Sequence, residues 1–253
     1  MRFASLGSGS RGNALIIDAG ETKLLLDCGF STRSTIQRLS RLGVQPEEIS
    51  ALLVTHEHSD HSAGVFKFAR RFACPVYLTH GTYLAMASEK EPDCHLIDSC
   101  NSFAIGGIEV QPFPVPHDAR EPVQFRFFDG VFRLGVLTDA GSVTQHIVDV
   151  LRAWDALVLE FNHDQAVLAA SDYPIVLKRR ISGKFGHLEN AQAIDLLSKI
   201  DTGRLQYLIA AHLSAQNNCR KRVADMLFSE FECLARQLDV ASQDEGFGWK
   251  QLV

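Results

Sequence analysis

The stretch Leu53-Val54-Thr55-His56-Glu57-His58-Ser59-Asp60-His61 brings three imidazoles and the Asp60 carboxylate together directly after an apolar run. Imidazole nitrogen and carboxylate oxygen are good ligands for zinc and its first-row neighbours. On a loop between a strand and a helix, residues two apart can point the same way. His56 and His58 can therefore share one ion, while Asp60 and His61 face a second. A plain polar turn is the alternative, but such a density of histidine is rare by chance, so the stretch predicts a metal site.

A closed metal site needs ligands from elsewhere in the chain, and three candidates follow other apolar runs. They are His117, Asp139 and His212, each placed at the end of a predicted strand. Loops at strand ends are common places for binding residues. Taken singly, each of these residues is more often a cap or an internally bonded polar group. Taken together with the histidine-rich turn, their number suits two metal ions.

Strand-like and helix-like segments alternate along the whole chain. We predict strands at 2–6, 14–18, 23–27, 51–55, 76–79, 108–115, 123–128, 131–138, 156–160 and 206–211. We predict helices at 31–42, 62–72, 143–153, 190–199 and 221–231. Asp129-Gly130 is a strong hairpin signal between two of the strands. This order favours a layered α/β body with mixed sheets, formed by a single domain over residues 1–253, rather than a parallel barrel.

The composition is that of an ordinary globular protein, with 46% hydrophobic and 22% charged residues among 253. Disorder is excluded by this apolar content, and no apolar run reaches the roughly 20 residues that a membrane span needs. The N-terminal residues show no secretory signal, and the six cysteines are scattered, so we expect reduced thiols and a cytoplasmic protein. The net charge of −5 argues weakly against a broad nucleic-acid footprint but not against a local one.

The segment Thr55–His61 resembles the H-x-H-x-D-H signature of the metallo-β-lactamase superfamily. The segment Leu24–Gly29 resembles the first motif of that family, which carries a buried aspartate, here Asp27. His117, Asp139 and His212 match its third, fourth and fifth motifs in order. The resemblance covers most of the chain and implies an αββα sandwich with a di-metal site at the sheet edges.

The resemblance also implies a role for each matching residue. His56, His58 and His117 would hold one metal, Asp60, His61 and His212 would hold the second, Asp139 would bridge both, and Asp27 would fix the histidine-bearing loop by hydrogen bonds. Two divalent ions lower the pKa of a shared water toward neutrality, which makes a hydrolase the first hypothesis. Zinc is the first expectation for these ions, with manganese and iron as alternatives.

Three local features resemble the YycJ/WalJ-like branch of the superfamily more narrowly. They are the opening Ser5–Asn13, the element Leu159–Asp164, and Gly186-His187-Leu188 followed by residues 211–214. Glu189 stands where this branch would have a small polar residue. Other branches fit less well, because Asp139 is not cysteine and the interval from Asp139 to His212 is too short for the inserted domain of β-CASP nucleases. The branch is associated with exonucleolytic DNA cleavage, so the resemblance implies a phosphodiesterase.

Phosphodiester hydrolysis needs an oriented water, a leaving-group acid and contacts to phosphate. We expect Asp60 to orient the water, and His187 or the Glu160/His163 pair to protonate the leaving oxygen or contact phosphate. Candidate substrate contacts are Ser8, Ser10 and Asn13 in the first loop, and Arg180 in the basic run Lys178-Arg179-Arg180, with Lys184 close by. A solvated helix face is the common alternative for such a run.

Two further hypotheses remain open from the sequence. The first is a thioester or lactone hydrolase of the same fold, which needs no basic track. The second is a non-enzymatic metal-binding sensor or partner protein, which the intact set of seven ligands argues against. The expected partner is nucleic acid or another phosphodiester substrate, with no membrane association, for a monomer or homodimer.

Overall fold

The computed structural model describes residues 1–86, 88 and 90–253. The chain forms two compact units, each built from strands and helices. Unit 1 comprises Met1–Pro114, Ala119–Phe132 and Ser242–Val253, and unit 2 comprises Val115–Asp118 and Arg133–Ala241.

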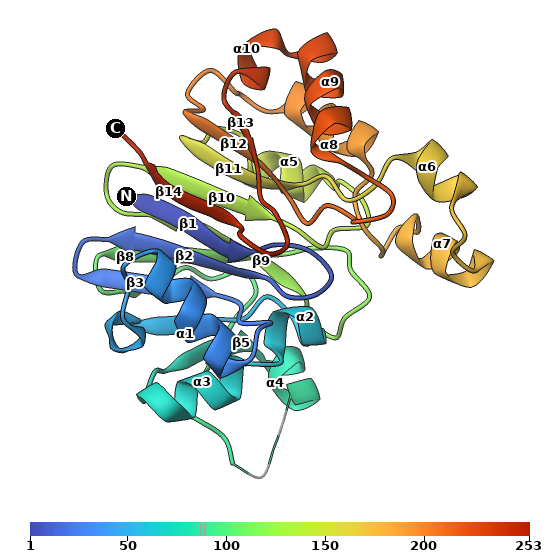
Figure 1. Ribbon diagram of the computed structural model, residues 1–253. Coiled ribbons are helices and arrows are strands. Elements are labelled where there is room, and N and C mark those ends of the chain that lie inside the picture. The colour runs from blue at the N-terminus through green and yellow to red at the C-terminus, as the bar shows by residue number, and fades with distance from the viewer. Residues whose placement is uncertain (87, 89) are drawn as a thin grey trace. The chain divides into compact units, whose positions relative to one another are not determined.

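Unit 1 contains a mixed seven-stranded sheet with the strand order β14-β1-β2-β3-β4-β5-β6 (Figure 1). Its strands are β1 (Arg2–Gly7), β2 (Ala14–Ala19), β3 (Thr22–Leu26), β4 (Ala51–Leu53), β5 (Val76–Thr79), β6 (Cys94–Ile97) and β14 (Phe247–Gln251). β3 and β4 pair in parallel, so their carboxyl ends lie at the same edge. The Asp27 amide donates to the Leu53 carbonyl at 2.8 Å. Asp27 therefore lies beside the segment that begins the histidine-rich turn.

Helices α1 and α3 pack their apolar faces against this sheet (Figure 1). The helical elements of unit 1 are α1 (Thr32–Arg41), the 3₁₀ turn η1 (Pro46–Glu48), α2 (Ser59–Ser62), α3 (Val65–Phe72) and α4 (His80–Met86). The helix predicted at 62–72 forms as α3 and ends where predicted, but it begins at Val65, because Ala63 and Gly64 separate it from α2. A Cβ on Gly64 would lie only 2.0 Å from the Phe30 carbonyl oxygen. Glycine is therefore needed here for the backbone to pack against the Cys28 segment, whose carbonyl accepts from the Gly64 amide at 2.8 Å.

Unit 1 also contains the antiparallel strands β7 (Phe103–Ile105), β8 (Ile108–Pro114) and β9 (Val123–Phe128). Val123, Phe125 and Phe127 alternate along β9 and are all buried, as expected for a strand with one face on a core. The turn at Asp129-Gly130 forms as predicted. Gly130 has a φ of 91°, and the Asp129 carboxylate accepts from the Val131 amide at 3.0 Å.

Unit 2 contains four parallel strands, β10 (Arg133–Leu137), β11 (Ala156–Glu160), β12 (Tyr207–Ala211) and β13 (Leu238–Val240). Leu137 pairs with Leu159 and Glu160 pairs with Ala211, so the strands end at a common edge. Parallel sheets commonly place functional side chains at this carboxyl edge. Asp139 and His212 follow two of these strands, and Glu160 is the last residue of a third.

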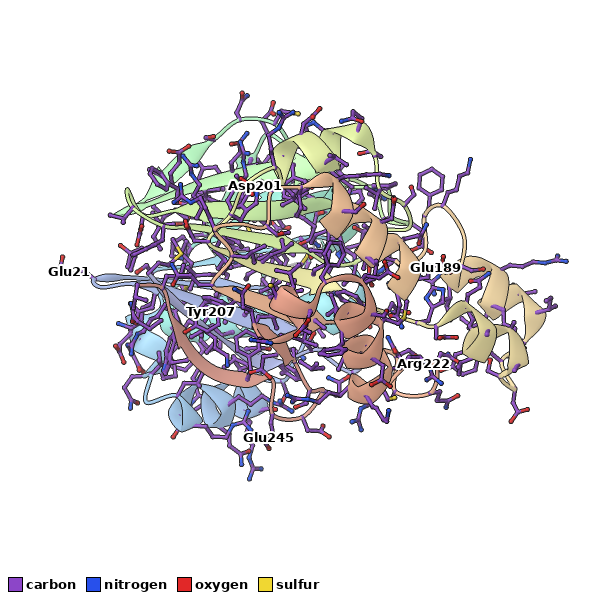
Figure 2. The ribbon with its side chains drawn as sticks, turned by 90° about the horizontal axis from the view of Figure 1, so that it is seen from above. Glu21, Glu189, Asp201, Tyr207, Arg222 and Glu245 are labelled. Atoms are coloured by element: carbon purple, nitrogen blue, oxygen red, sulfur yellow. The ribbon has the colours of Figure 1, made fainter. Side chains whose placement is uncertain are left out.

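The helices of unit 2 connect these strands. They are α5 (Gln145–Val150), α6 (Gln165–Ala170), α7 (Ile175–Ile181), α8 (Asn190–Lys199), α9 (Arg220–Glu230) and α10 (Glu232–Ala235). Glu189, labelled in Figure 2, precedes α8 and forms a capping box with Gln192. Helix α7 differs from α8 because none of its residues is buried. Among the described residues, no helix is both long enough and apolar enough to span a membrane.

Candidate functional site

The residues predicted from sequence lie in both units. Unit 1 carries Ser8, Ser10, Asn13, Asp27, His56, His58, Asp60 and His61, and unit 2 carries His117, Asp139, Glu160, His163, Arg180, His187 and His212. Within unit 1, we call His56, His58, Asp60 and His61 the turn cluster. Within unit 2, Asp139, Glu160, His187 and His212 offer ligand atoms that all lie within 4.8 Å of one another, and we call them the edge cluster.

The turn cluster is compact because β4 is followed at once by a tight turn into α2. The ring of His56 lies 4.6 Å from that of His58 and 4.3 Å from that of His61, measured between centroids. Asp60 Oδ2 lies 3.5 Å from His61 Nε2. His56 and His61 are both 1% exposed, so the burial of these polar rings requires partners.

Asp27 supplies those partners. Its Oδ2 accepts a hydrogen bond from His61 Nδ1 at 2.8 Å, and the Thr55 hydroxyl donates to the same oxygen at 2.9 Å. The Thr55 hydroxyl oxygen in turn lies 2.9 Å from His56 Nδ1. Burial raises the pKa of Asp27, although the charge and hydrogen bond of His61 oppose this shift. The Asp27 carboxylate and Thr55 hydroxyl together orient two imidazoles, and Thr55 was not singled out by the sequence.

The first loop holds the turn cluster from the other side through Asn13. The Asn13 amide donates to the Asp60 carbonyl at 2.7 Å, and its side-chain nitrogen lies 3.1 Å from His61 Nε2. Ser8 is buried and its amide donates to Ser242 at 3.0 Å. Of the three loop residues predicted to contact substrate, Ser10 is the one that is exposed. Asn13 is placed to position the turn.

Glu160 lies at the centre of the edge cluster. Its Oε1 accepts from His187 Nδ1 at 2.8 Å and from His212 Nδ1 at 3.0 Å. Its Oε2 accepts from the backbone amides of Ala140 at 3.0 Å and Leu188 at 3.2 Å. Burial by itself raises the pKa of Glu160, but the charge of His187 and the hydrogen bonds of both histidines lower it to about 2. Glu160 is therefore ionised near neutral pH and uses both oxygens to hold its neighbours.

Asp139 and His117 complete the polar surroundings of this cluster. Asp139 Oδ1 lies 3.3 Å from His212 Nδ1 and 4.0 Å from His117 Nε2. His117 Nδ1 donates to the Gly186 carbonyl at 3.0 Å. Burial lowers the pKa of His117, opposed by the charge of Asp139. The bond to Gly186 fixes the His117 ring, and its Nε2 lies 3.6 Å from Asp118 Oδ1 and 4.0 Å from Asp139 Oδ1.

Three of the predicted site residues have a left-handed backbone. The φ angles are 60° at Asp27, 51° at Asp139 and 54° at His212. Asp and His tolerate this region better than most residues, but it is still strained. The side-chain amide of Asn162 donates to the His212 carbonyl at 2.9 Å, which stabilises this conformation. Each of the three residues ends a strand, so the left-handed turn directs its side chain along the carboxyl edge of the sheet.

The hydrogen bonds assign the same tautomer to four buried histidines. Nδ1 of His56, His61, His117 and His212 faces Thr55, Asp27, the Gly186 carbonyl and Glu160, respectively. With the proton on Nδ1, the lone pair is on Nε2. Histidines that bind metals usually donate their other ring N–H to such a partner. The imidazole and carboxylate donors therefore fit zinc, and also manganese or iron.

Two predicted residues lie apart from the edge cluster. His163 is 1% exposed, its Nδ1 lies 3.3 Å from the Asn162 side-chain oxygen, and within the described part of the chain its Nε2 has no hydrogen-bond partner. Burial lowers the pKa of His163. Arg180 is exposed, and its Nε donates to Asp118 at 2.6 Å. Asp118, which the sequence did not single out, follows His117 directly and so links Arg180 to a predicted metal ligand.

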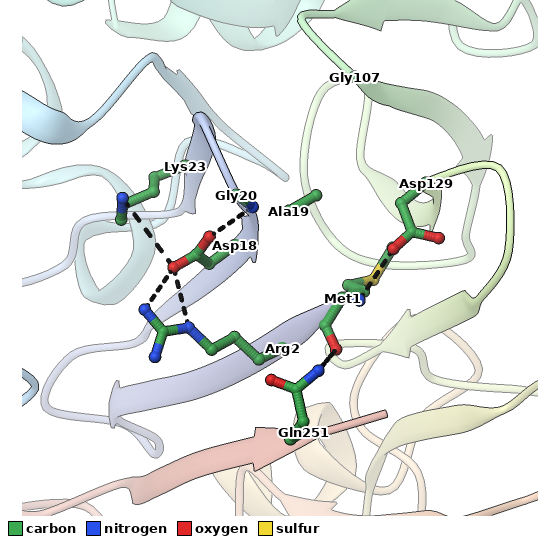
Figure 3. Close-up of a pocket in the computed structure, with 9 residues that line it drawn as sticks. All are labelled: Met1, Arg2, Asp18, Ala19, Gly20, Lys23, Gly107, Asp129 and Gln251. Carbon is green, nitrogen blue, oxygen red and sulfur yellow. Dashed lines mark hydrogen bonds and ion pairs between the residues drawn. The ribbon is translucent and has the colours of Figure 1, made fainter. Parts of the chain in front are cut away.

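A separate polar pocket of about 650 Å³ lies in unit 1 and is shown in Figure 3. Arg2 and Lys23 line it, but Arg2 pairs with Asp18 at 2.8 Å and Lys23 pairs with Glu48 at 3.0 Å. None of the residues predicted to be functional lines this pocket. Its charges are matched internally, so we assign it no role in the chemistry.

Comparison with known proteins gives the same family as the sequence motifs. Residues 22–209 match the family described as the β-lactamase superfamily domain. The chain is 36% identical over 234 residues to exodeoxyribonuclease YycJ of Bacillus anthracis, covering 91% of this chain and 88% of that protein. It is 31% identical over 226 residues to exodeoxyribonuclease WalJ of Streptococcus pneumoniae, covering 87% and 84%.

Solved structures show the fold. The metallo-β-lactamase fold protein YhfI from Bacillus subtilis matches with a TM-score of 0.74 and 16% identity, covering 99% of both chains. The short form of human tRNase Z matches with a TM-score of 0.68 and 17% identity over 100% of both chains. The predicted α/β class and αββα sandwich are thereby confirmed. The chain belongs to the metallo-β-lactamase superfamily, in the YycJ/WalJ-like branch.

Proposed function

We propose that this chain is a metal-dependent phosphodiesterase that degrades DNA from an end, as the names of its YycJ and WalJ relatives state for those proteins. The observation that carries the proposal is the shared tautomer of the buried histidines. Four imidazoles engage Nδ1 in hydrogen bonds, so Nε2 is the nitrogen that each would present to a metal. At His61 the side-chain nitrogen of Asn13 lies 3.1 Å from this Nε2. A structural role alone would not require the same ring orientation at four separate positions.

The proposed metal ligands follow the family pattern. We propose that His56, His58 and His117 would hold one ion, that Asp60, His61 and His212 would hold the other, and that Asp139 would serve both, as the family resemblance implies. We propose zinc, with manganese and iron as the alternatives that the same donors accept. Two divalent ions, when bound, lower the pKa of a shared water and neutralise charge on the phosphate oxygens. Asp27 and Glu160 contribute by fixing the rings that ligate.

The remaining catalytic roles, orienting the water and protonating the leaving oxygen, fall to side chains of the protein. Asp60 has 21% of its side chain exposed, and we propose that it orients the attacking water. Glu160 uses both oxygens in hydrogen bonds, so we propose that it positions His187 rather than donating a proton. His187 is 21% exposed whereas His163 is 1% exposed. We therefore propose His187 as the acid for the leaving oxygen, with its protonated form stabilised by Glu160.

The partner follows from this chemistry. We propose a nucleic-acid substrate and a monomeric or homodimeric protein. We also propose a cytoplasmic location, which the scattered cysteines favour. Nothing in the geometry of either cluster favours a thioester or lactone, and these substrates serve as the competing outcome of the test.

The test is a substrate panel for the metal-loaded protein. It compares 5′-labelled single-stranded and duplex DNA with thioesters and lactones, for the wild type and for Asp60→Ala. Asp93→Ala, at an exposed carboxylate of unit 1 that is 74% accessible, is the matched control. We expect DNA cleavage that is lost in Asp60→Ala by about 100-fold or more, on the scale of a removed catalytic group, and unchanged in Asp93→Ala. Cleavage in excess chelator, or a preference for thioesters by several orders of magnitude, would contradict the proposal.

A further inference from the structure

Helix α7 and the residues after it form an unusual surface in unit 2. We call residues 175–185 the α7 arm. No residue of α7 is buried, and three large apolar side chains of the arm are mostly exposed, Ile175 at 60%, Val176 at 74% and Phe185 at 61%. In Figures 1 and 2, α6 and α7 extend outward from the rest of unit 2. Large exposed apolar side chains within one short segment make this segment a candidate binding surface.

The α7 arm is also strongly basic. It contains Lys178, Arg179, Arg180 and Lys184 and no acidic residue, in a chain whose net charge is −5. Arg180 pairs with Asp118. Within the described ranges, no carboxylate lies at ion-pair distance from Lys178, Arg179 or Lys184. Arg179 and Lys184 are therefore available to an anionic partner. Lys178, whose Nζ donates to the Ala169 carbonyl at 2.7 Å, adds a third positive charge to the same segment.

The arm and the residue after it contact loops that lie next to the edge cluster in the sequence. Arg180 Nε donates to Asp118 Oδ2 at 2.6 Å, beside His117. The Gly186 carbonyl, immediately after the arm, accepts from His117 Nδ1 at 3.0 Å. The Ser142 hydroxyl donates to the Lys184 carbonyl at 3.2 Å, close to Asp139. A polymer lying along the arm would thus be led to the loops that carry His117 and Asp139.

These observations select one class of partner. We propose that the α7 arm binds the single-stranded end of the nucleic-acid substrate, an inference that rests on the proposed nuclease function. Phosphates would contact Lys178, Arg179 and Lys184, and unpaired bases would stack on Phe185 and pack on Ile175 and Val176. Base stacking on aromatic side chains combined with a basic track is how proteins bind single strands without reading sequence. A duplex hides its base faces and could use only the cations.

The test measures binding separately from cleavage. The metal-loaded protein is titrated against a fluorescein-labelled, hydrolysis-resistant phosphorothioate oligonucleotide of about 20 nucleotides, as a single strand and as a blunt duplex. Phe185→Ala should weaken single-strand binding by about tenfold and leave duplex binding within twofold. Lys178→Ala/Arg179→Ala should weaken binding of both and reduce the slope of log K against log salt by about 1.4, since each cation contributes about 0.7 for a single strand.

The matched control removes two cations elsewhere in unit 2. Lys199→Ala/Arg236→Ala, on α8 and just after α10, changes the net charge equally and should leave binding within twofold. Equal affinity of Phe185→Ala and wild type for the single strand would overturn the inference. So would a wild-type dimer that Phe185→Ala converts to a monomer in sedimentation, because the arm would then bind a second copy of this chain. Failure of the wild type to hydrolyse any phosphodiester would reject the proposed function, while the binding titration would still decide whether the arm recognises single strands.

Discussion

Oδ2 of Asp27 lies 2.8 Å from Nδ1 of His61, and both side chains are buried. The contact joins Asp27, which follows β3 and has a left-handed backbone conformation, to His61, the last histidine of the turn after β4. It fixes both the rotation of the imidazole and the nitrogen that carries the proton. Nε2 is thereby directed to the same neighbourhood as Asp60. The proposed metal ligand His61 is thus oriented by a second residue, Asp27, that need not touch the metal.

Replacing Asp27 with Asn tests this contact. Asn keeps the size of the side chain but removes the charge, so the His61 tautomer and orientation are no longer enforced. We expect metal affinity to fall by about 10- to 100-fold, as for other residues that orient metal-binding histidines. Competition with a fluorescent chelator measures this affinity. Asp18→Asn is the matched control, because Asp18 is also buried but pairs with Arg2 and Lys23. This control should leave metal affinity unchanged. Equal losses of metal affinity in both variants would refute the role assigned to Asp27.

Glu160 predicts a pH dependence of stability. Its pKa is lowered in the folded protein to about 2 from an ordinary 4.5, so its ionised form is favoured by folding. The stability it contributes is fully present above pH 4.5 and is lost as the pH falls through about 2. In the metal-free protein, the difference in free energy of unfolding between wild type and Glu160→Gln should therefore shrink across this range. Urea unfolding measures it, with the exposed-strand variant Glu109→Gln as control; a difference independent of pH would contradict the assignment.

Much of the fold was predictable because its signals are local. The strands predicted at 76–79, 123–128 and 156–160 and the helix at 190–199 match the observed elements residue for residue. The short edge strands β6 and β13 and the short helices α6 and α7 were not predicted. Their segments are brief and largely exposed, so periodicity carries little information there. Their structure depends on contacts that are distant in the sequence.

In the candidate site, too, residue types with a local signal were predictable, whereas roles that depend on distant contacts were not. The histidine-rich turn and the strand-end residues His117, Asp139 and His212 could be proposed from sequence because metal ligands are restricted to a few residue types. Thr55 and Asn162 lie within the quoted motifs but were given no role, because a hydroxyl or amide that orients another side chain looks like any other polar group. The holding role of Glu160 also required coordinates, because only they show that both of its oxygens are engaged.

Gly29 tests how tightly the first motif packs on the turn cluster. A Cβ at this position would lie 1.7 Å from the Asp60 carbonyl oxygen, so Gly29→Ala must displace the turn. We expect a loss of about 1–3 kcal/mol in the free energy of unfolding, typical of overpacking, together with weaker metal binding. Gly107→Ala is the control, since a Cβ at Gly107 would meet no neighbouring atom within 4 Å. If Gly29→Ala bound metal as tightly as the wild type, the turn that carries Asp60 would tolerate the extra methyl group, and the prediction would be wrong.

The cysteines give a prediction about reactivity. Burial raises the pKa of the Cys28 thiol to about 11 and that of Cys74 to about 12, so both stay protonated and unreactive near neutral pH. Cys100, Cys219 and Cys233 are exposed and should be alkylated first. Brief iodoacetamide treatment followed by peptide mass spectrometry tests this order, and early labelling of Cys28 would contradict the packing around Asp27.

The central claim is that the imidazoles and carboxylates of the turn and edge clusters hold two divalent ions. Elemental analysis of the purified, metal-replete protein measures this most directly, reported as moles of metal per mole of chain. The account predicts two ions per wild-type chain, and fewer in a variant that replaces Asp139 with Ala. A wild-type chain that retains one ion or none under saturating metal would contradict it.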